Sequence, residues 1–142
     1  MIRFSLALLF VSLFAFQSIG QDITTKQLLV EAADLLNQGW TPTHSIDYSK
    51  LDDDESVTLT FTLDGDWEYR IIAFCDEDCK DLDMTLFDEN DNEIDKDNDE
   101  GDYAPVIRVS PSWTGEFSLT VTMFDCEVEP CKMVVGIFGK ED

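Results

Sequence analysis

The first apolar pattern with a regular period lies between residues 25 and 38, where the spacing is that of an α-helix. Its apolar side chains recur on one helical face, at Leu28, Leu29, Ala32, Leu35 and Leu36. Thr24 or Thr25 is available as the N-cap and Gly39 as the stop signal. The pattern predicts an amphipathic helix, which either packs on its own domain or docks on a partner.

After Gly39 the period changes to two, which is typical of β-strands with one buried face. In residues 57–63, four apolar residues alternate with three threonines, and Asp64-Gly65 predicts a tight hairpin turn into a strand at 67–74. Further strands are expected at 82–87, 106–109, 116–124 and 132–138, with weaker candidates at 43–48 and 92–95. Seven or eight short strands with no helix between them predict an all-β fold, an antiparallel β-sandwich.

The strand at 67–74 has apolar side chains on both faces. Ile72 and Phe74 project opposite to Tyr69, Ile71 and Ala73, which share the core face. The helix that precedes the sandwich is expected to cover these outer side chains. The chain is therefore divided into an N-terminal segment at 1–20, a helix at 21–39 and one β-sandwich domain at 40–142.

Residues 1–20 have the composition of a secretory signal peptide. A cationic start with Arg3 precedes an apolar run at 4–16, and Ser18 and Gly20 are small residues at the −3 and −1 positions of a cleavage site. The apolar run is shorter than the roughly 20 residues of a membrane-spanning helix. We therefore expect a secreted or periplasmic protein that begins at Gln21 and does not associate with a membrane after cleavage.

The four cysteines form two close pairs, Cys75 with Cys79 and Cys126 with Cys131. In an exported chain an even number of cysteines favours disulfides over a metal site, and the spacing lacks the short pairs and histidines of a zinc site. Four cysteines allow three connectivities. The two local pairs are favoured, because each pair flanks a polar turn between strand-like segments.

The balance of charges limits the choice of partners. The sequence has 31 Asp+Glu against 9 Lys+Arg, a formal charge of −22. A nucleic-acid partner needs a basic stripe that displaces counterions from the phosphates, and the cations here are scattered singly along the chain. We therefore expect no nucleic acid and no anionic lipid surface as a partner.

Acidic residues are most concentrated at 76–102, where 14 of 27 residues are Asp or Glu. Hard oxygen ligands suit calcium rather than zinc or copper. The candidate ligands are Asp81 and Asp83, which flank one residue of a strand, and the alternating run of Asp95, Asp97 and Asp99. No frame of this segment matches an EF-hand loop. Two interpretations stay open: a structural calcium site, or an acidic rim that only keeps the protein soluble.

Three stretches of the sequence resemble the bacterial pre-peptidase C-terminal domain. These are the Asp81-Leu82-Asp83 pair opening an apolar strand, the acidic segment and strand at 51–63 followed by Gly65 and Tyr69, and the Gly115-Glu116-Phe117 strand start. The likeness covers residues 51–139, with Asp91 in a turn position that usually holds glycine. The resemblance implies a jelly-roll-like sandwich related to the collagen-binding modules of bacterial collagenases. It also implies calcium binding, which carries over to Asp52, Asp53, Asp54 and Glu55.

The residue inventory favours binding over catalysis. The chain has one histidine, His44, in a loop or edge-strand context, and no recognisable nucleophile with its base. Candidate ligand-binding aromatics are Trp40, Tyr103 and Trp113. We expect a monomeric, secreted, non-catalytic binding or accessory module stabilised by calcium. The alternative is a metal-free adhesion module that binds an extracellular polysaccharide or protein, with acidity serving solubility only.

Overall fold

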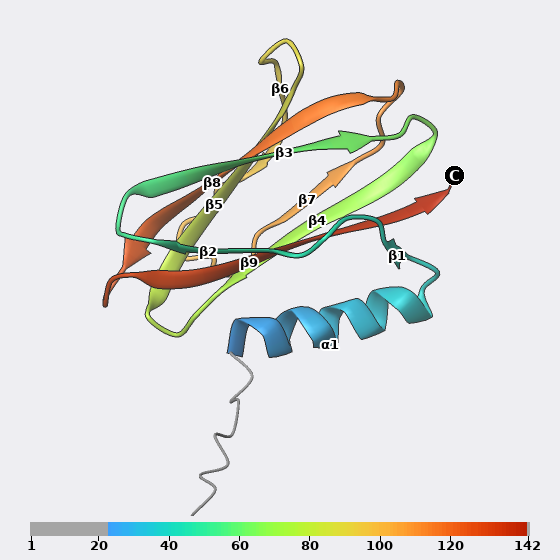
Figure 1. The fold of residues 1–142 in the computed structure, drawn as a ribbon. Helices are drawn as coiled ribbons and strands as arrows, with labels where there is room; N and C mark the ends of the chain where they lie inside the picture. Colours follow the sequence, from blue (N-terminus) through green and yellow to red (C-terminus); the bar gives the residue numbers. More distant parts are fainter. Residues whose placement is uncertain (1–22, 142) are drawn as a thin grey trace, which may run out of the picture.

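The computed structural model describes residues 23–141, which form one helix and nine β-strands (Figure 1). The predicted signal peptide, residues 1–20, lies outside the described residues. The elements in chain order are α1 (Ile23–Asn37), β1 (Thr41–Pro42), β2 (Asp47–Leu51), β3 (Glu55–Leu63), β4 (Trp67–Cys75), β5 (Cys79–Asp88), β6 (Glu93–Asp97), β7 (Val106–Val109), β8 (Gly115–Cys126) and β9 (Cys131–Glu141).

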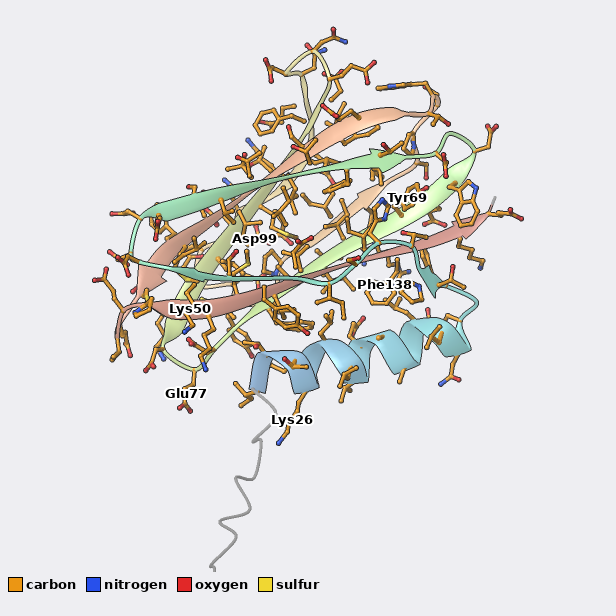
Figure 2. All side chains as sticks on the ribbon, viewed as in Figure 1. Lys26, Lys50, Tyr69, Glu77, Asp99 and Phe138 are labelled. Carbon is orange, nitrogen blue, oxygen red and sulfur yellow. A yellow bond between two sulfur atoms is a disulfide. The ribbon has the colours of Figure 1, made fainter. Side chains whose placement is uncertain are left out.

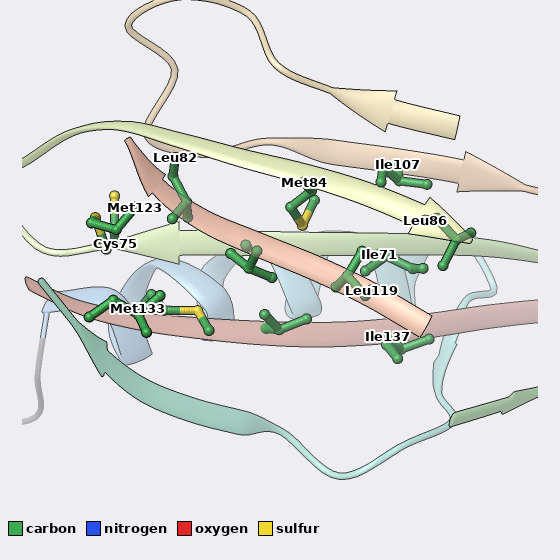
Figure 3. Packing of buried hydrophobic residues seen from close by; sticks show 14 of the residues in the cluster. Ile71, Cys75, Leu82, Met84, Leu86, Ile107, Leu119, Met123, Met133 and Ile137 are labelled. Carbon is green, nitrogen blue, oxygen red and sulfur yellow. The ribbon is translucent and has the colours of Figure 1, made fainter. Parts of the chain in front are cut away.

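The strands form two antiparallel sheets that face each other. The five-stranded sheet has the order β1-β9-β4-β7, with β2 also pairing with β9, and the four-stranded sheet has the order β3-β8-β5-β6. Apolar side chains fill the space between the sheets, as Figure 3 shows for Ile71 and Ile137 of one sheet and Met84 and Leu119 of the other. The predicted all-β sandwich with an N-terminal helix is therefore confirmed, although it has nine strands rather than seven or eight.

Two local predictions differ from the structure. The weak strand candidate at 43–48 overlaps a strand only at its last two residues, because β1 ends at Pro42 and the ladder with β9 resumes only at Asp47. The Asp64-Gly65 turn does not make a hairpin, because β3 pairs with β8 while β4 pairs with β7 and β9 in the other sheet. The Tyr69 hydroxyl accepts a hydrogen bond from the Asp64 backbone N–H at 3.0 Å, which fixes this turn between the sheets.

Helix α1 covers the outer face of the five-stranded sheet (Figure 1). Leu28 and Leu35 are buried against apolar outer side chains of β4 and β9, namely Ile72, Val134 and Phe138, with Phe74 packed at the edge of the cluster. The predicted cover of Ile72 and Phe74 is thus confirmed. Leu29 and Leu36 were assigned to the same helix face but are 47% and 51% exposed, so for them the prediction was wrong.

The N-terminal end of α1 differs from the prediction, and its C-terminal end agrees with it. Because the helix begins at Ile23, Thr24 and Thr25 are helical residues and neither is the N-cap. Gly39 ends the helix as predicted, with a φ of 86°. The N–H of Gly39 donates to the carbonyl of Leu36 at 3.1 Å and that of Trp40 to the carbonyl of Leu35 at 3.0 Å, which is the Schellman pattern.

Both disulfides join the local cysteine pairs, as favoured from the sequence. Cys75–Cys79 and Cys126–Cys131 each have a Cα–Cα distance of 5.9 Å. Each one closes a short connection that passes from one sheet to the other, between β4 and β5 or between β8 and β9. Cys79 pairs with Cys126 in the β5–β8 ladder, so the two disulfides lie at the same end of the sandwich.

Candidate functional site

Several carboxylates of the acidic segment accept hydrogen bonds from the backbone of turns. Asp88 accepts bonds from the side chain and backbone N–H of Asn92 and from the backbone N–H of Asn90, and these bonds, those of Asn92 foremost, lower its pKa. Asp97 accepts the N–H of Val106 and Asp102 that of Ala104, both at 2.8 Å. Some of the acidic side chains therefore stabilise turns by accepting backbone hydrogen bonds.

The acids at 52–55, which the family resemblance marks as calcium ligands, lie at the β2–β3 turn. Asp53 Oδ1 accepts the N–H of Cys126 at 2.7 Å, and Glu55 Oε2 accepts the N–H of Asp52 at 2.8 Å. Asp54 has a φ of 60°, a conformation that Asp tolerates better than most residues. The structure gives Asp53 and Glu55 a role in holding this turn, and metal binding by the four residues stays a prediction.

Asp81 and Asp83 lie near the start of β5, away from Asp88 and the turn that it holds. Asp81 is 8% exposed, and its Oδ1 has no hydrogen-bond partner among the described residues. Burial raises the pKa of the neighbouring Asp83, and the charges of Asp81 and Asp97 raise it further. Asp81, Asp83 and Asp97 thus share one region at the β5–β6 side of the four-stranded sheet, where ionisation of Asp83 is disfavoured.

The remaining candidate ligands are placed elsewhere along the same edge. Asp95 pairs with Leu86 in the β5–β6 ladder, and Asp99 lies in the loop after β6, where its carbonyl accepts the N–H of Asp102 at 3.2 Å. Within residues 23–141, no three His, Cys, Asp or Glu side chains are grouped closely enough to hold a metal ion by themselves. A cation here would therefore need backbone oxygens and water among its ligands.

The three aromatics expected to contact a ligand have different surroundings. Trp40 is only 4% exposed, because it packs under α1 and the guanidinium of Arg70 lies 4.6 Å from its ring, so its assignment as a ligand-binding aromatic was wrong. Trp113 is 39% exposed and stacks on Phe117 with a centroid distance of 5.6 Å. Tyr103 is 54% exposed in the loop before β7.

A cavity of about 390 Å³ lies between the first turn of α1 and strands β2 and β9. Its lining includes Tyr48, which is 58% exposed, and two lysines, Lys50 and Lys132, which are direct partners in the β2–β9 ladder. Figure 2 shows Lys50 near the N-terminal end of α1. The sequence pattern does not predict this cavity, because its two lysines are 82 positions apart and are neighbours only through strand pairing.

The one histidine of the chain has a structural environment. The Nδ1 of His44 is 2.8 Å from the Thr43 hydroxyl, its Nε2 is 2.8 Å from the Thr62 carbonyl, and its ring meets Phe61 edge-on. The Nε2 contact joins the β1–β2 connection to the end of β3, whereas the Nδ1 contact stays within that connection.

A comparison of the chain with models of known protein families and with curated proteins finds no match. Among residues 23–141, no helix is long and apolar enough to cross a membrane. Two disulfides with no free cysteine in that part of the chain favour an oxidising compartment.

Proposed function

We propose that this protein is a non-catalytic binding or accessory module that is secreted or periplasmic, and that calcium held by Asp81 and Asp83 on β5 stabilises it. One observation carries the calcium part: Asp81 is buried and has a carboxylate oxygen without a partner. A buried carboxylate that lacks a partner destabilises a fold, and a cation beside it removes that cost.

Calcium fits this region better than other metals. It takes about six to eight oxygen ligands, and carboxylates, backbone carbonyls and water all serve. The raised pKa of Asp83, caused first by burial and then by the charges of Asp81 and Asp97, marks a place where a positive charge is favoured. Two carboxylates completed by carbonyls and water give a weak site, with a dissociation constant of about 10⁻⁴ to 10⁻³ M, as in other extracellular modules.

The binding role is supported by exposed aromatic side chains and by the engagement of the histidine. Tyr48, Tyr103 and Trp113 offer rigid contact area at the surface. Both ring nitrogens of His44 make contacts within the fold, to the Thr43 hydroxyl and the Thr62 carbonyl. The two disulfides agree with a module that works outside the cytoplasm.

Thermal unfolding of the disulfide-bonded protein with calcium or with a chelator, at constant ionic strength, tests the calcium part. With a dissociation constant near 1 mM, about 10 mM calcium adds about 1.4 kcal/mol, which raises Tm by about 4–6 °C. Asp81→Asn should abolish the shift. Asp66→Asn makes the same charge change in an exposed turn at the other end of the sandwich and should keep it. An unchanged Tm of the wild-type protein removes calcium from the proposal.

A second candidate is a metal-free adhesion module whose acidity serves turn formation and solubility. It is favoured by the carboxylates of Asp53, Glu55, Asp88 and Asp97, which already accept backbone N–H groups. In that case, sodium chloride and calcium chloride of equal ionic strength should change Tm equally. Binding to arrays of glycans and matrix proteins tests the role that both candidates share, and no specific binder on either array would count against it.

A further inference from the structure

Helix α1 leaves a second apolar stripe exposed after it has packed on the sheet. Leu28 and Leu35 are buried against β4 and β9, whereas Leu29, Val30 and Leu36 are 47%, 72% and 51% exposed. Within residues 23–141, no element covers this outer side of the helix (Figure 1). We propose that the stripe is a dimer interface, on which α1 of a second copy of the chain packs in the antiparallel direction. The proposal goes beyond the proposed function, needs no calcium and replaces the monomer expected from the sequence.

The exposed side chains are neighbours on the helix surface. Leu29, Ala33 and Leu36 follow one another at intervals of four and three residues, and Val30 lies beside them. Packed helices have axes about 8–10 Å apart, and a small exposed residue such as Ala33 allows the shorter distance. Contiguous apolar side chains at a protein surface mark an interaction site, whereas single ones need no explanation.

The charges of α1 are placed against the dipole of the helix. The N-terminal end of a helix carries partial positive charge and the C-terminal end partial negative charge. The first turn of α1 has no acidic residue and contains Lys26, and the last turn has no basic residue and contains Asp34. Both charges are therefore unfavourable in the isolated helix. Within residues 23–141, Lys26 forms no ion pair that offsets this cost.

An antiparallel copy of the same helix supplies the missing charges. In such a pair, the first turn of each helix lies beside the last turn of the other. Lys26 then comes within reach of Asp34 of the partner subunit, and twofold symmetry repeats the contact. Each charge also lies at the dipole end that it prefers. Val30 is midway between these two residues in the sequence, so it lies at the crossing point. Figure 2 shows Lys26 on the side of α1 that points away from the sheets.

The face covered by α1 is also where two copies of this acidic protein repel each other least. The net charge of −22 opposes self-association in general. Arg70, Arg108 and Lys140 lie on strand positions that face α1, whereas the acids of β5 and β6 belong to the other sheet. A helix of 15 residues is only about 22 Å long, so the contact area is small and the dimer is weak.

Sedimentation equilibrium of the disulfide-bonded protein, at about 0.15 M salt and from about 0.01 to 1 mM protein, tests the proposal. A reversible monomer–dimer equilibrium is expected. Lys26→Glu and Asp34→Lys should each weaken the dimer about tenfold, because two attractive contacts become repulsive. The double variant should restore the dissociation constant to within about threefold of wild type. Both single changes suit the helix dipole, so α1 should stay folded in each.

Apolar and charged controls come from the other sheet. Leu29→Gln and Leu36→Gln should each weaken the dimer at least about tenfold. Phe124→Gln removes a larger side chain, 55% exposed on β8, and should leave the dimer unchanged. Lys96→Glu makes the charge change of Lys26→Glu on β6, and there the dissociation constant should stay within about threefold of wild type.

Three results would overturn the proposal. The first is a monomer at every concentration, or a dimer that Leu29→Gln leaves unchanged. The second is a double variant that dimerises as weakly as the single ones, because the two charges then do not meet. The third is a tighter dimer in Asp34→Lys than in wild type, because net charge alone then governs association. Since the dimer is expected without calcium, its absence leaves the calcium-dependent Tm shift as a separate test of the proposed function.

Discussion

Replacing Leu28 with alanine should detach or loosen α1, because this side chain is only 1% exposed and lies at the centre of the cluster between the helix and the five-stranded sheet. Replacing a buried leucine with alanine lowers the free energy of unfolding by about 2–5 kcal/mol. Gly136 allows the close contact, since a Cβ there would lie 2.9 Å from Leu28 Cδ1. The loss cannot exceed the free energy with which the whole helix docks, because a fully detached helix has no further contacts to lose.

The chain supplies its own control at the next position. Leu29 is 47% exposed, and alanine there should cost less than about 1 kcal/mol. The second adjacent pair repeats the test, since Leu35 is fully buried and Leu36 is 51% exposed. In both pairs the residue type and the helix propensity change are identical, so the difference within a pair measures burial against the sheet.

Urea unfolding with the disulfides intact measures the difference. With an m-value of about 2 kcal/mol/M, a loss of 3 kcal/mol lowers the midpoint by about 1.5 M. Amide hydrogen exchange in α1 should speed up in Leu28→Ala and stay close to wild type in Leu29→Ala. Equal losses in Leu28→Ala and Leu29→Ala would show that the helix does not pack through the face described above.

Three further changes have definite signs. Asp83→Asn should raise the free energy of unfolding at neutral pH without calcium, because the raised pKa of Asp83 means that the fold opposes its ionisation. The gain should vanish as the pH falls through the folded pKa towards about 3.9, the pKa of an unfolded Asp. Melting temperatures measured across this pH range test the prediction. Gly39→Ala forces a side chain into a φ of 86° and should cost about 1 kcal/mol, seen as a lower urea midpoint. Replacing Cys126 and Cys131 by alanine removes a constraint on a short loop and should cost about 2 kcal/mol in the same assay; no loss would show that the turn is held by its other bonds.

The parts of the fold that follow local rules could be predicted from the sequence. Alternation at 57–63 marks β3, and the helical period of about 3.6 residues places Leu28 and Leu35 within the apolar stripe of α1. Local spacing could not separate Leu28 from Leu29, because both are leucines within one broad apolar stripe. Only the position of the sheet decides which edge of that stripe is covered.

The pairing of strands could not be predicted, because it depends on contacts between distant segments. Asp64-Gly65 has the residues of a hairpin turn, yet β3 finds its ladder partner in β8, some sixty positions away at Ser56 and Thr122. The candidate sites divide in the same way. The acids of β5 could be named from the sequence, whereas the burial of Asp81 and the meeting of Lys50 with Lys132 required the fold.

Charge is distributed unevenly over the described part of this protein. Eight of the ten residues in the connections 52–54, 76–78 and 127–130 are acidic. Six of the eight Lys and Arg residues in 23–141 instead lie on α1 or on strand positions facing it, at Lys26, Lys50, Arg70, Arg108, Lys132 and Lys140. A helix that covers the less acidic face places its N-terminal end beside the lysine pair.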